Sequence, residues 1–414
     1  MYTKTPVHLF RAHFGILIGG CAAGLAAAFV VCSFPFDFPA QINEAKRLGI
    51  VSLTILNGYP KSRDVLCYAA LVLLPVTCSL SLWLAWSRGK RAEIASRLDF
   101  ARQAGEPLPG RTLLATFLLL LCLVLKFNIN NFYAPTGGWA FLGEEGQFLA
   151  DVQVLLSGGE YARDFFSLYG PLVVYPLAWA MKLFGVSMVT GRVYSYALSV
   201  LAATILVMLL DRTIRNRSLF IFAVSAMGGV FISGGGRTSA TMLRVMLGFL
   251  PLLILYRTGD KGKAVPAFIA GALLGTSLLY SQEVGVCAAV AAGVFLLLQT
   301  LAGGDIRGLL VQGGIFSAAC TLVLAPVFGY FHGKGALGAF FESLYGYPKY
   351  VTLGYGSLPF PSVGQLLSAP LSDAYFPYWM IGIYICGAIN VLVLLFLGRR
   401  DADLSFRAAL LVFG

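Results

Sequence analysis

Residues 264–301 read AVPAFIAGALLGTSLLY, then SQE, then VGVCAAVAAGVFLLLQTL, so two apolar runs flank a polar triplet. A transmembrane helix needs about 20 mostly apolar residues, with a range of roughly 17–25. The runs 264–281 and 284–301 fall in that range, and the residues between them are enough for a tight turn. This stretch predicts two consecutive membrane-crossing helices, with Glu283 at the membrane edge where they meet.

Runs of the same kind recur along the whole chain of 414 residues. Hydrophobic residues form 58% of the chain and charged residues 12%, whereas a soluble domain carries about 25% charge. We therefore exclude a soluble protein and predict an all-α, polytopic transmembrane helix bundle of about ten or eleven spans. An eleventh run begins at Ala408 and stops at Gly414, which predicts a truncated C-terminus. The complete candidate spans are 14–34, 64–86, 112–129, 192–210, 218–234, 242–256, 264–281, 284–301, 309–331 and 377–397.

The net charge of +11, from 30 Lys and Arg against 19 Asp and Glu, predicts how the chain lies in the membrane. Basic residues of membrane proteins gather in cytoplasmic loops. With the N-terminus inside and residues 168–187 not crossing, 18 basic residues fall on the inner side and 9 on the outer side. If 168–187 crosses, the counts become 11 inside and 15 outside. The excess of basic residues thus predicts the orientation of the chain in the membrane and does not indicate a nucleic-acid partner.

Residues 168–187 are accordingly predicted to form a re-entrant or interfacial helix on the outer face. Gly170, Pro171 and Pro176 interrupt this run and Lys182 places a charge in it. Irregular backbone at membrane depth is tolerated where it lines a cavity. The alternative is an ordinary span that violates the charge rule. In the favoured arrangement two long segments, 127–191 and 333–376, lie outside.

The first outer segment carries an acidic pair, Glu144 and Glu145, ahead of a short apolar stretch. We predict a helix from Glu144 to Ser157, stopped by Gly158. The pair would then lie in the first helical turn, where negative charge is favoured by about 0.3–1 kcal/mol, so both carboxylates would stay ionised as a general base requires. Glu144, Phe148 and Asp151 would share one face. The alternative is simple charge complementarity at a water-exposed helix end.

The second outer segment is aromatic and rich in turn residues between Tyr345 and Pro361. Tyrosine suits both sugars and membrane interfaces, and Lys349 is placed to meet an anionic headgroup. A segment this long with no structure of its own is typical of a lid. An interfacial aromatic belt is the alternative. The eight Cys stand singly and the three His are scattered, so neither a disulfide framework nor a zinc site is indicated.

Four motifs, the acidic pair among them, follow one another in the first outer segment. They are an acidic pair, a G-x-x-Y-R-D-F-like stretch, an aromatic-Gly-Pro-Leu segment and a Leu-Phe-Gly-Val-Ser helix end. In this chain the motifs are Glu144-Glu145, Gly159-Glu160-Tyr161-Ala162-Arg163-Asp164-Phe165, Tyr169-Gly170-Pro171-Leu172 and Leu183-Phe184-Gly185-Val186-Ser187.

This order resembles the GT-C superfamily of integral-membrane glycosyltransferases, which use polyprenyl-phosphate sugars, near the bacterial mannosyltransferase and aminoarabinose-transferase branch. The resemblance covers roughly residues 111–293. It implies a GT-C-like transmembrane catalytic module over 111–414, preceded by an N-terminal two-span extension with a basic cytoplasmic loop over 1–110. It also implies a multi-pass protein of the inner membrane with its active site on the periplasmic side.

By this resemblance, a sugar passes from a polyprenyl phosphate to a hydroxyl of a glycan, lipid or protein, with inversion. Glu144, where most relatives have Asp, would be the general base, backed by Glu145. No cofactor is required by these motifs, and a divalent metal ion bridging carboxylate and phosphate is left open. The residues expected to contact the donor phosphate or substrate are Arg237, Glu283, Gln282, Arg163, Asp164, Lys182, Tyr169 and Lys349.

Two other kinds of function fit the composition. A polytopic transporter or lipid flippase would use its intramembrane charges to line a path and would need no general base. A catalytically inactive membrane scaffold would need neither a path lined by charges nor a general base. For Arg237 the plain alternative is snorkelling at a helix end, and for Glu283 it is capping or ion pairing. Arg244, two helical turns after Arg237, is expected to pair with an acid or to face the same cavity.

Overall fold

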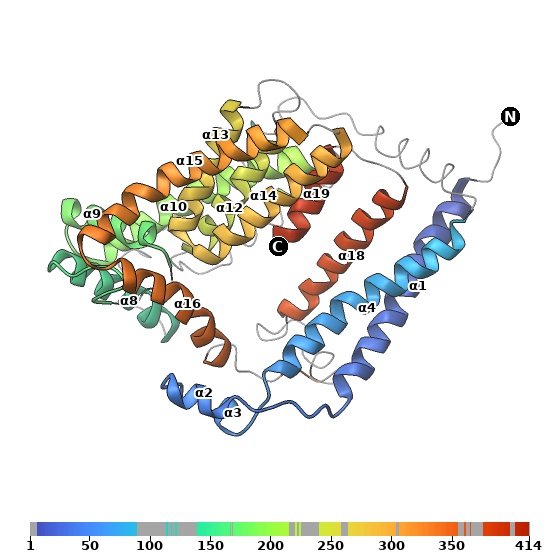
Figure 1. The fold of residues 1–414 in the computed structure, drawn as a ribbon, viewed down its shortest axis with the longest axis horizontal. Coiled ribbons are helices and arrows are strands. Elements are labelled where there is room, and N and C mark those ends of the chain that lie inside the picture. Colours follow the sequence, from blue (N-terminus) through green and yellow to red (C-terminus); the bar gives the residue numbers. More distant parts are fainter. Residues whose placement is uncertain are drawn as a thin grey trace. The chain divides into compact units, whose positions relative to one another are not determined.

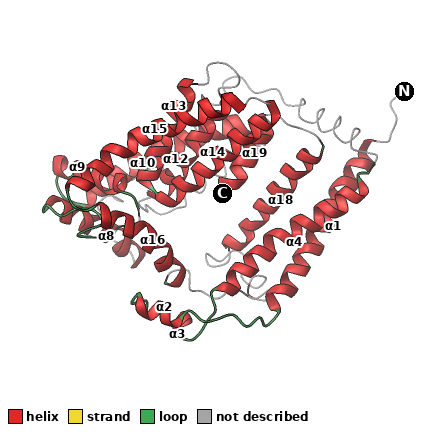
Figure 2. Ribbon diagram, in the orientation of Figure 1, coloured by secondary structure: helices red, strands yellow, loops and turns green. Residues whose placement is uncertain are grey.

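The structure is a computed structural model, and its described residues are almost entirely helical (Figures 1 and 2). In the described part of the chain the backbone forms helices, loops and a single isolated β-bridge between Tyr161 and Phe165. The side chains of residues 139–145 and 347–349 lie outside the description. The described residues are 6–88, 113–114, 117, 121, 139–165, 167, 169–214, 220–221, 223–224, 240–257, 264–303, 306–354, 360–361, 365, 376–397 and 402–413.

The predicted fold class is confirmed: this is an all-α, multi-pass membrane architecture. Judged on the described residues, five helices are long and apolar enough to cross a membrane. Their windows lie within α1 (Pro6–Ser33), α4 (Ser62–Trp86), α10 (Met188–Thr213), α14 (Gln282–Gly303) and α15 (Ile306–Gly333).

Three other predicted spans form helices whose described apolar parts are shorter. They are α12 (Ala240–Arg257), α13 (Ala264–Tyr280) and α18 (Phe376–Phe396). The tight turn expected after residue 280 is present, since α13 ends at Tyr280 and α14 begins at Gln282. Predicted spans 112–129 and 218–234 lie mostly outside the described residues, and the run from Ala408 belongs to α19 (Ala402–Phe413).

The chain forms two compact units, and the first contains residues 1–98 and 344–412. In it α1 and α4 run side by side, with small residues at their contact (Figure 1). A Cβ at Gly24 would lie 2.4 Å from the Cα of Pro75, so the two backbones touch. Small residues that bring backbones together are the usual basis of helix association in membranes. Here the fully buried Ser79 of α4 donates its hydroxyl to the carbonyl of Leu17, 3.0 Å away.

Replacing Ser79 by alanine is expected to weaken this helix pair slightly. Hydrogen bonds between transmembrane helices contribute about 0.6 kcal/mol on average, because the separated helices find other partners. The melting temperature of the purified protein should fall by a small, measurable amount. Thr77→Ala is the matched control, since the Thr77 hydroxyl bonds within its own helix, to the carbonyl of Leu73. Equal melting of both variants would show that the hydrogen bond between helices contributes nothing.

The rest of the first unit packs around the same helix pair. Helix α18 lies against α4 through a core that includes Trp83 and Ile389. The indole Nε1 of Trp83 donates to His13 Nδ1 at 2.9 Å. At the other end, the buried Asp64 accepts from Tyr59 and pairs with Lys61. The short helices α2 (Ile42–Arg47) and α3 (Leu53–Leu56) precede α4.

The second unit contains residues 99–343 and holds most of the residues predicted to act in function. Helices α12, α13, α14 and α15 pack against one another, and α8 (Trp139–Leu156) and α9 (Pro171–Phe184) pack against each other and α10. At 14 residues α9 is about 21 Å long, shorter than the roughly 30 Å of a bilayer core. That α9 is interfacial or re-entrant stays a prediction. The core here includes Val152, Val174, Leu177, Met181, Ala202, Leu243 and Met246.

The second predicted outer segment is not without structure, which corrects the sequence-based expectation. Residues 337–353 form helix α16 (Leu337–Leu353), which begins in the second unit and ends in the first. The start of α16 is ordered by aromatic packing, since Phe340 stacks on Phe331 with ring centroids 5.2 Å apart. The pattern Leu337, Phe340, Phe341 and Leu344 has helical spacing, which the abundance of Gly, Pro and Tyr concealed.

The two compact units do not coincide with the predicted boundary at residue 110. The first unit combines the N-terminal helices with the C-terminal segment, whereas the prediction separated only residues 1–110. Compactness reports packing and says nothing of catalysis. The division into a two-span extension and a catalytic module therefore stays a prediction.

Candidate functional site

Helix α8 places the acidic pair differently from the prediction. The helix begins at Trp139 rather than Glu144 and has no acidic residue in its first turn. The residues before the pair, Trp139 to Leu142, are apolar and continue the helix, so the pair lies in the second turn. Because the stabilisation of anions by a helix N-terminus fades within the first turn, it no longer accounts for ionised carboxylates here. Glu144 and Glu145 stay catalytic predictions, since their side chains are not described.

The connection from α8 to α9, residues 157–170 (hereafter the α8–α9 loop), is fastened to the helix bundle. Helix α8 ends at Leu156, and Gly158 follows with a φ of 91°, as expected for the predicted helix stop. The hydroxyl of the buried Tyr161 donates to the carbonyl of Tyr169 at 2.6 Å. At the end of the loop the Gly170 N–H donates to the carbonyl of Tyr280 at 3.0 Å. The loop therefore lies directly on the end of α13.

An ion pair lies where α12, α14 and the α8–α9 loop meet. Arg244 Nη1 is 2.7 Å from Glu283 Oε1. The Arg244 guanidinium lies over the ring of Tyr169, 5.2 Å from its centroid, and Tyr169 in turn stacks on Phe148 of α8. Arg244 Nε is buried and has no hydrogen-bond partner among the described residues. The structure thus brings together two predicted residues, Glu283 and Tyr169, and gives Arg244 the acidic partner expected for it.

Asp151 supplies a buried carboxyl group beside this cluster. It is 5% exposed, and its Oδ2 has no hydrogen-bond partner in the described part of the chain. Burial raises the pKa of Asp151 to about 7. Burial also raises the pKa of Tyr161, a hydrogen bond with Gln282 lowers it, and the nearby Asp151 and Glu283 raise it further. Tyr161 therefore lies close enough to Asp151, Gln282 and Glu283 to interact with all three.

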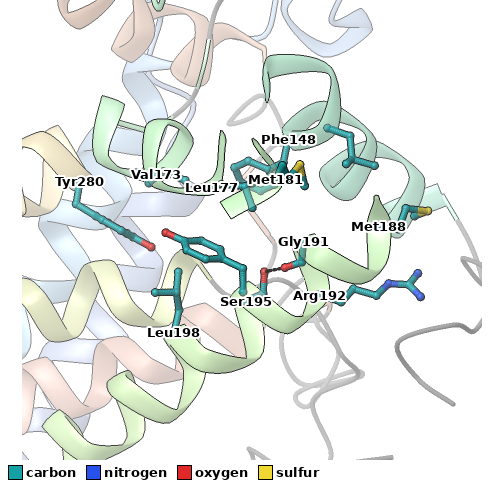
Figure 3. A pocket seen from close by; sticks show the side chains of 12 residues that line it. Phe148, Val173, Leu177, Met181, Met188, Gly191, Arg192, Ser195, Leu198 and Tyr280 are labelled. Carbon is teal, nitrogen blue, oxygen red and sulfur yellow. Dashed lines mark hydrogen bonds between the residues drawn. The ribbon is translucent and has the colours of Figure 1, made fainter. Parts of the chain in front are cut away.

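A small cavity of about 30 Å³ lies against the same elements (Figure 3). Apolar side chains from α8, α9 and α10 form most of its wall, including Phe148, Leu177 and Leu198. Tyr280 of α13 also lines the cavity, and its buried hydroxyl has no hydrogen-bond partner among the described residues. Such a volume has room for one or two water molecules. The cavity is thus an apolar space with a polar group in its wall.

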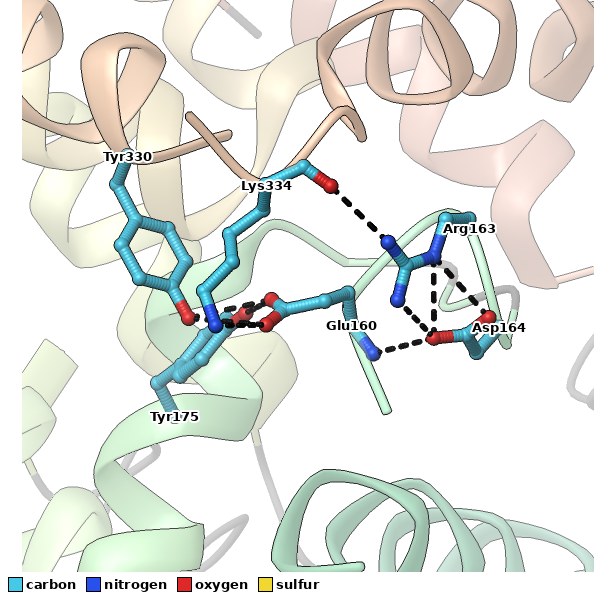
Figure 4. Close-up of polar contacts among 6 residues, drawn as sticks. All are labelled: Glu160, Arg163, Asp164, Tyr175, Tyr330 and Lys334. Atoms are coloured by element: carbon cyan, nitrogen blue, oxygen red, sulfur yellow. Dashed lines mark hydrogen bonds and ion pairs between the residues drawn. The ribbon is translucent and has the colours of Figure 1, made fainter. Parts of the chain in front are cut away.

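A second cluster fixes the middle of the α8–α9 loop to the end of α15 (Figure 4). The buried carboxylate of Glu160 lies 3.2 Å from Lys334 Nζ and accepts hydrogen bonds from the hydroxyls of Tyr175 and Tyr330, each at 3.2 Å. Arg163 Nη1 donates to the carbonyl of Lys334 at 3.0 Å. These contacts join residues that are up to 174 positions apart in the chain, the separation of Glu160 and Lys334.

Arg163 and Asp164 serve this attachment in the structure. Arg163 Nη2 is 2.9 Å from Asp164 Oδ2, which also accepts from the N–H of Glu160 at 2.7 Å. The hydrogen bond from Arg163 lowers the pKa of Asp164, and that from the Glu160 N–H adds to the effect. Both side chains are thus engaged in holding the turn of the loop. In the structure the pair thus caps the loop electrostatically.

The remaining predicted residues are not brought to the cluster by the described structure. Lys182 is exposed in the last turn of α9. Lys349 belongs to α16, but its side chain is not described, and Arg237 lies outside the described residues altogether. Glu160, Lys334, Tyr175 and Tyr330 were missed as a group. In the sequence Glu160 is an isolated acid within a loop and Lys334 is an isolated base after a span. No local pattern connects them with the two tyrosines.

The arrangement defines a class of protein without defining its reaction. The chain is an all-α, multi-pass membrane protein with a polar cluster at the α8–α9 loop. Within the described residues no three His, Cys, Asp or Glu side chains gather as metal ligands. Comparison of the chain with protein-family models, curated proteins and solved structures finds no match.

Proposed function

We propose that this protein is a membrane glycosyltransferase that moves a sugar from a polyprenyl phosphate to an acceptor hydroxyl at the outer leaflet. The observation that supports the proposal is the buried polar cluster at the α8–α9 loop, where a carboxyl group and an arginine each have an atom without a partner among the described residues. This transfer requires a base and an anion-binding group. The proposed type of reaction is based on the order of the motifs in residues 144–187.

In the proposed reaction a carboxylate of α8 takes the proton of the acceptor hydroxyl, with Glu144 and Glu145 as the sequence-based candidates. The acceptor oxygen attacks the anomeric carbon from the face opposite the phosphate, and the bond from that carbon to the phosphate oxygen breaks. The electron pair stays on the phosphate. The product sugar therefore has inverted configuration.

Arg244 is the described residue best placed to bind the departing phosphate. Its Nε–H has no partner among the described residues, while Glu283 and the Tyr169 ring hold the guanidinium in place. Arginine binds phosphate well because its planar fork presents several donors in fixed directions. The predicted donor contacts Arg237, Lys182 and Lys349 would add to this charge.

The test is transfer by the purified protein in liposomes that contain polyprenyl phosphate carrying a radiolabelled sugar. Wild-type protein is expected to release polyprenyl phosphate when a crude extract of envelope glycans and lipids supplies the acceptor. Arg244→Lys keeps the charge but loses the planar fork, so we expect at least a tenfold lower rate, with a larger loss for Arg244→Gln. Glu144→Gln should lower the rate only if Glu144 is the base.

The competing proposal is a transporter or flippase of lipid-linked sugars, which the same vesicles can detect. A flippase moves the labelled lipid between leaflets, where a membrane-impermeant oxidant attacks its sugar, and it releases no polyprenyl phosphate. Transport without release would refute glycosyl transfer. If the protein showed neither activity with any donor in a panel of hexosyl and pentosyl polyprenyl phosphates, the inactive scaffold would be favoured.

A further inference from the structure

Among the carboxylates whose side chains the structure describes, Asp151 is the buried one with an unpartnered oxygen. A buried polar atom without a partner is costly, typically about 1–3 kcal/mol, so such atoms are rare and call for an explanation. Glu160, the other buried acid of the second unit, has three partners. Asp151 therefore differs from a carboxylate that only stabilises the fold.

Three more buried polar groups near the start of α14 also lack a hydrogen-bond partner in the described structure. They are Arg244 Nε, the Tyr280 hydroxyl and the Ser281 hydroxyl. Ser281 precedes Gln282, which bonds to Tyr161, and Tyr161 also interacts with Asp151. Several unpartnered donors and acceptors in one region indicate a place where a polar ligand or water completes the hydrogen bonding.

The position of Asp151 on α8 directs it towards the same region. Phe148, one turn earlier, lines the cavity and stacks on Tyr169, while Val152 is part of the core below α9. The side chains of Glu144 and Glu145, by contrast, lie outside the described residues. Because α8 starts at Trp139, Glu144 and Glu145 lie beyond its first turn. The electrostatic field of the helix N-terminus therefore does not keep their carboxylates ionised.

We propose that Asp151, rather than Glu144 or Glu145, is the carboxylate that takes the proton of the acceptor hydroxyl. This inference rests on the proposed glycosyl transfer and names its base. The acceptor O–H bond breaks, the proton passes to Asp151 Oδ2, and the acceptor oxygen forms the new bond to the anomeric carbon. The phosphate leaves with the electron pair of the broken bond. Since Oδ2 is closed off from solvent here, the α8–α9 loop must move to admit the acceptor.

A base works best when its pKa lies near the working pH, because it is then ionised yet still basic. Burial brings Asp151 to this range, with a pKa of about 7. The titratable or charged residues on the elements packed against α8 include Tyr175 and Lys182 on α9 and Arg192 and Tyr194 on α10, and Tyr161 of the loop interacts with Asp151. Tyr175 bonds to Glu160, and Lys182 is exposed. Loss of a transition near pH 7 in Asp151→Asn would therefore assign that transition to Asp151.

The deciding experiment measures the pH dependence of polyprenyl phosphate release by Asp151→Asn, Asp151→Glu and Glu144→Gln. Wild-type protein should lose activity as the pH falls through about 7, because the protonated base is inactive. Asp151→Asn should lower kcat by about 100-fold or more and remove this acidic limb. Asp151→Glu should restore part of the rate and keep the limb. Glu144→Gln should keep both the limb and most of the rate.

A second readout shows whether a loss of activity has a merely structural cause. Binding of the donor to Asp151→Asn should match that to Gln153→Asn, a control on the exposed side of α8. The melting temperatures of the two variants should match at about pH 4, where Asp151 is protonated. The raised pKa means that ionising Asp151 destabilises the folded state, so wild-type stability should fall as the pH rises from about 4 to 7. That fall should be absent from Asp151→Asn.

Each outcome separates the two proposals. If wild-type protein releases polyprenyl phosphate and Asp151→Asn does so at a similar rate with the same acidic limb, Asp151 is not the base although glycosyl transfer stands. If Glu144→Gln removes the limb instead, the sequence-based assignment is right and ours is wrong. If wild-type protein forms no glycosyl product, the transfer itself is refuted, and the role of Asp151 with it.

Discussion

Gly170→Ala should unfold or severely destabilise the second unit and abolish any activity at the α8–α9 loop. A Cβ at residue 170 would lie 2.1 Å from the carbonyl oxygen of Leu279 and 2.6 Å from its carbonyl carbon. Both atoms belong to backbone inside α13, so neither can turn away as a side chain would. Overpacking in a core costs about 1–3 kcal/mol and sometimes more, and we expect the upper end. Relief would require the loop to lift off α13 and break the Gly170–Tyr280 hydrogen bond.

Thermal unfolding in detergent and the yield of monodisperse protein measure this effect. Gly146→Ala is the matched control, because it makes the same change on exposed α8, where a new Cβ has no neighbour within 4 Å. In a helix interior alanine is more favourable than glycine by about 0.5–1 kcal/mol, so this control should melt slightly higher. Should Gly170→Ala melt like wild-type protein, the loop does not lie on α13 as described.

The helices of this protein were predictable wherever a long apolar run carried the information locally. Helix α14 and the turn before it were predictable from the residues around Glu283. In lipid a backbone must form its hydrogen bonds internally, so a long apolar run forms a helix. The stop of α8 near Gly158 was predictable for the same local reason. Its start was not, because Trp139 to Leu142 are apolar residues that suit a span, an interface or an amphipathic helix equally.

The candidate site was predictable only in part, because its contacts join distant segments. Glu283 and Tyr169 stood out as a charge at a membrane edge and an aromatic residue before Gly-Pro. Asp151 was placed on the right face of its helix, but its burial depends on how α8 packs on α9 and α10. Nothing in the sequence relates Glu160 to Tyr330, 170 positions later. Such pairings depend on tertiary structure, which local patterns do not determine.

Glu160→Ala is the other substitution expected to have a large effect, because it removes the acceptor shared by Tyr175, Tyr330 and Lys334. Two tyrosine hydroxyls would be left without this partner, and the loop would lose its attachment to the end of α15. We expect a loss of roughly 2–3 kcal/mol, read as a lower melting temperature and faster proteolysis within residues 157–170. Glu160→Gln keeps an oxygen that can accept from the tyrosines, so it should lose less.

A double-mutant cycle with Lys334→Ala separates the ion pair from the hydrogen bonds. The Lys334 side chain is 51% exposed, so solvent screens its charge and the coupling with Glu160 should be small, about 0.5–1 kcal/mol. Most of the stability loss caused by Glu160→Ala should therefore remain when Lys334→Ala is also present. It should disappear when Tyr175→Phe and Tyr330→Phe are both present. If instead Lys334→Ala alone reproduced the full loss, the attachment of the loop would be electrostatic and should weaken with added salt. Retention of proteolytic resistance in Glu160→Ala would mean that Gly170 and Tyr161 hold the loop without it.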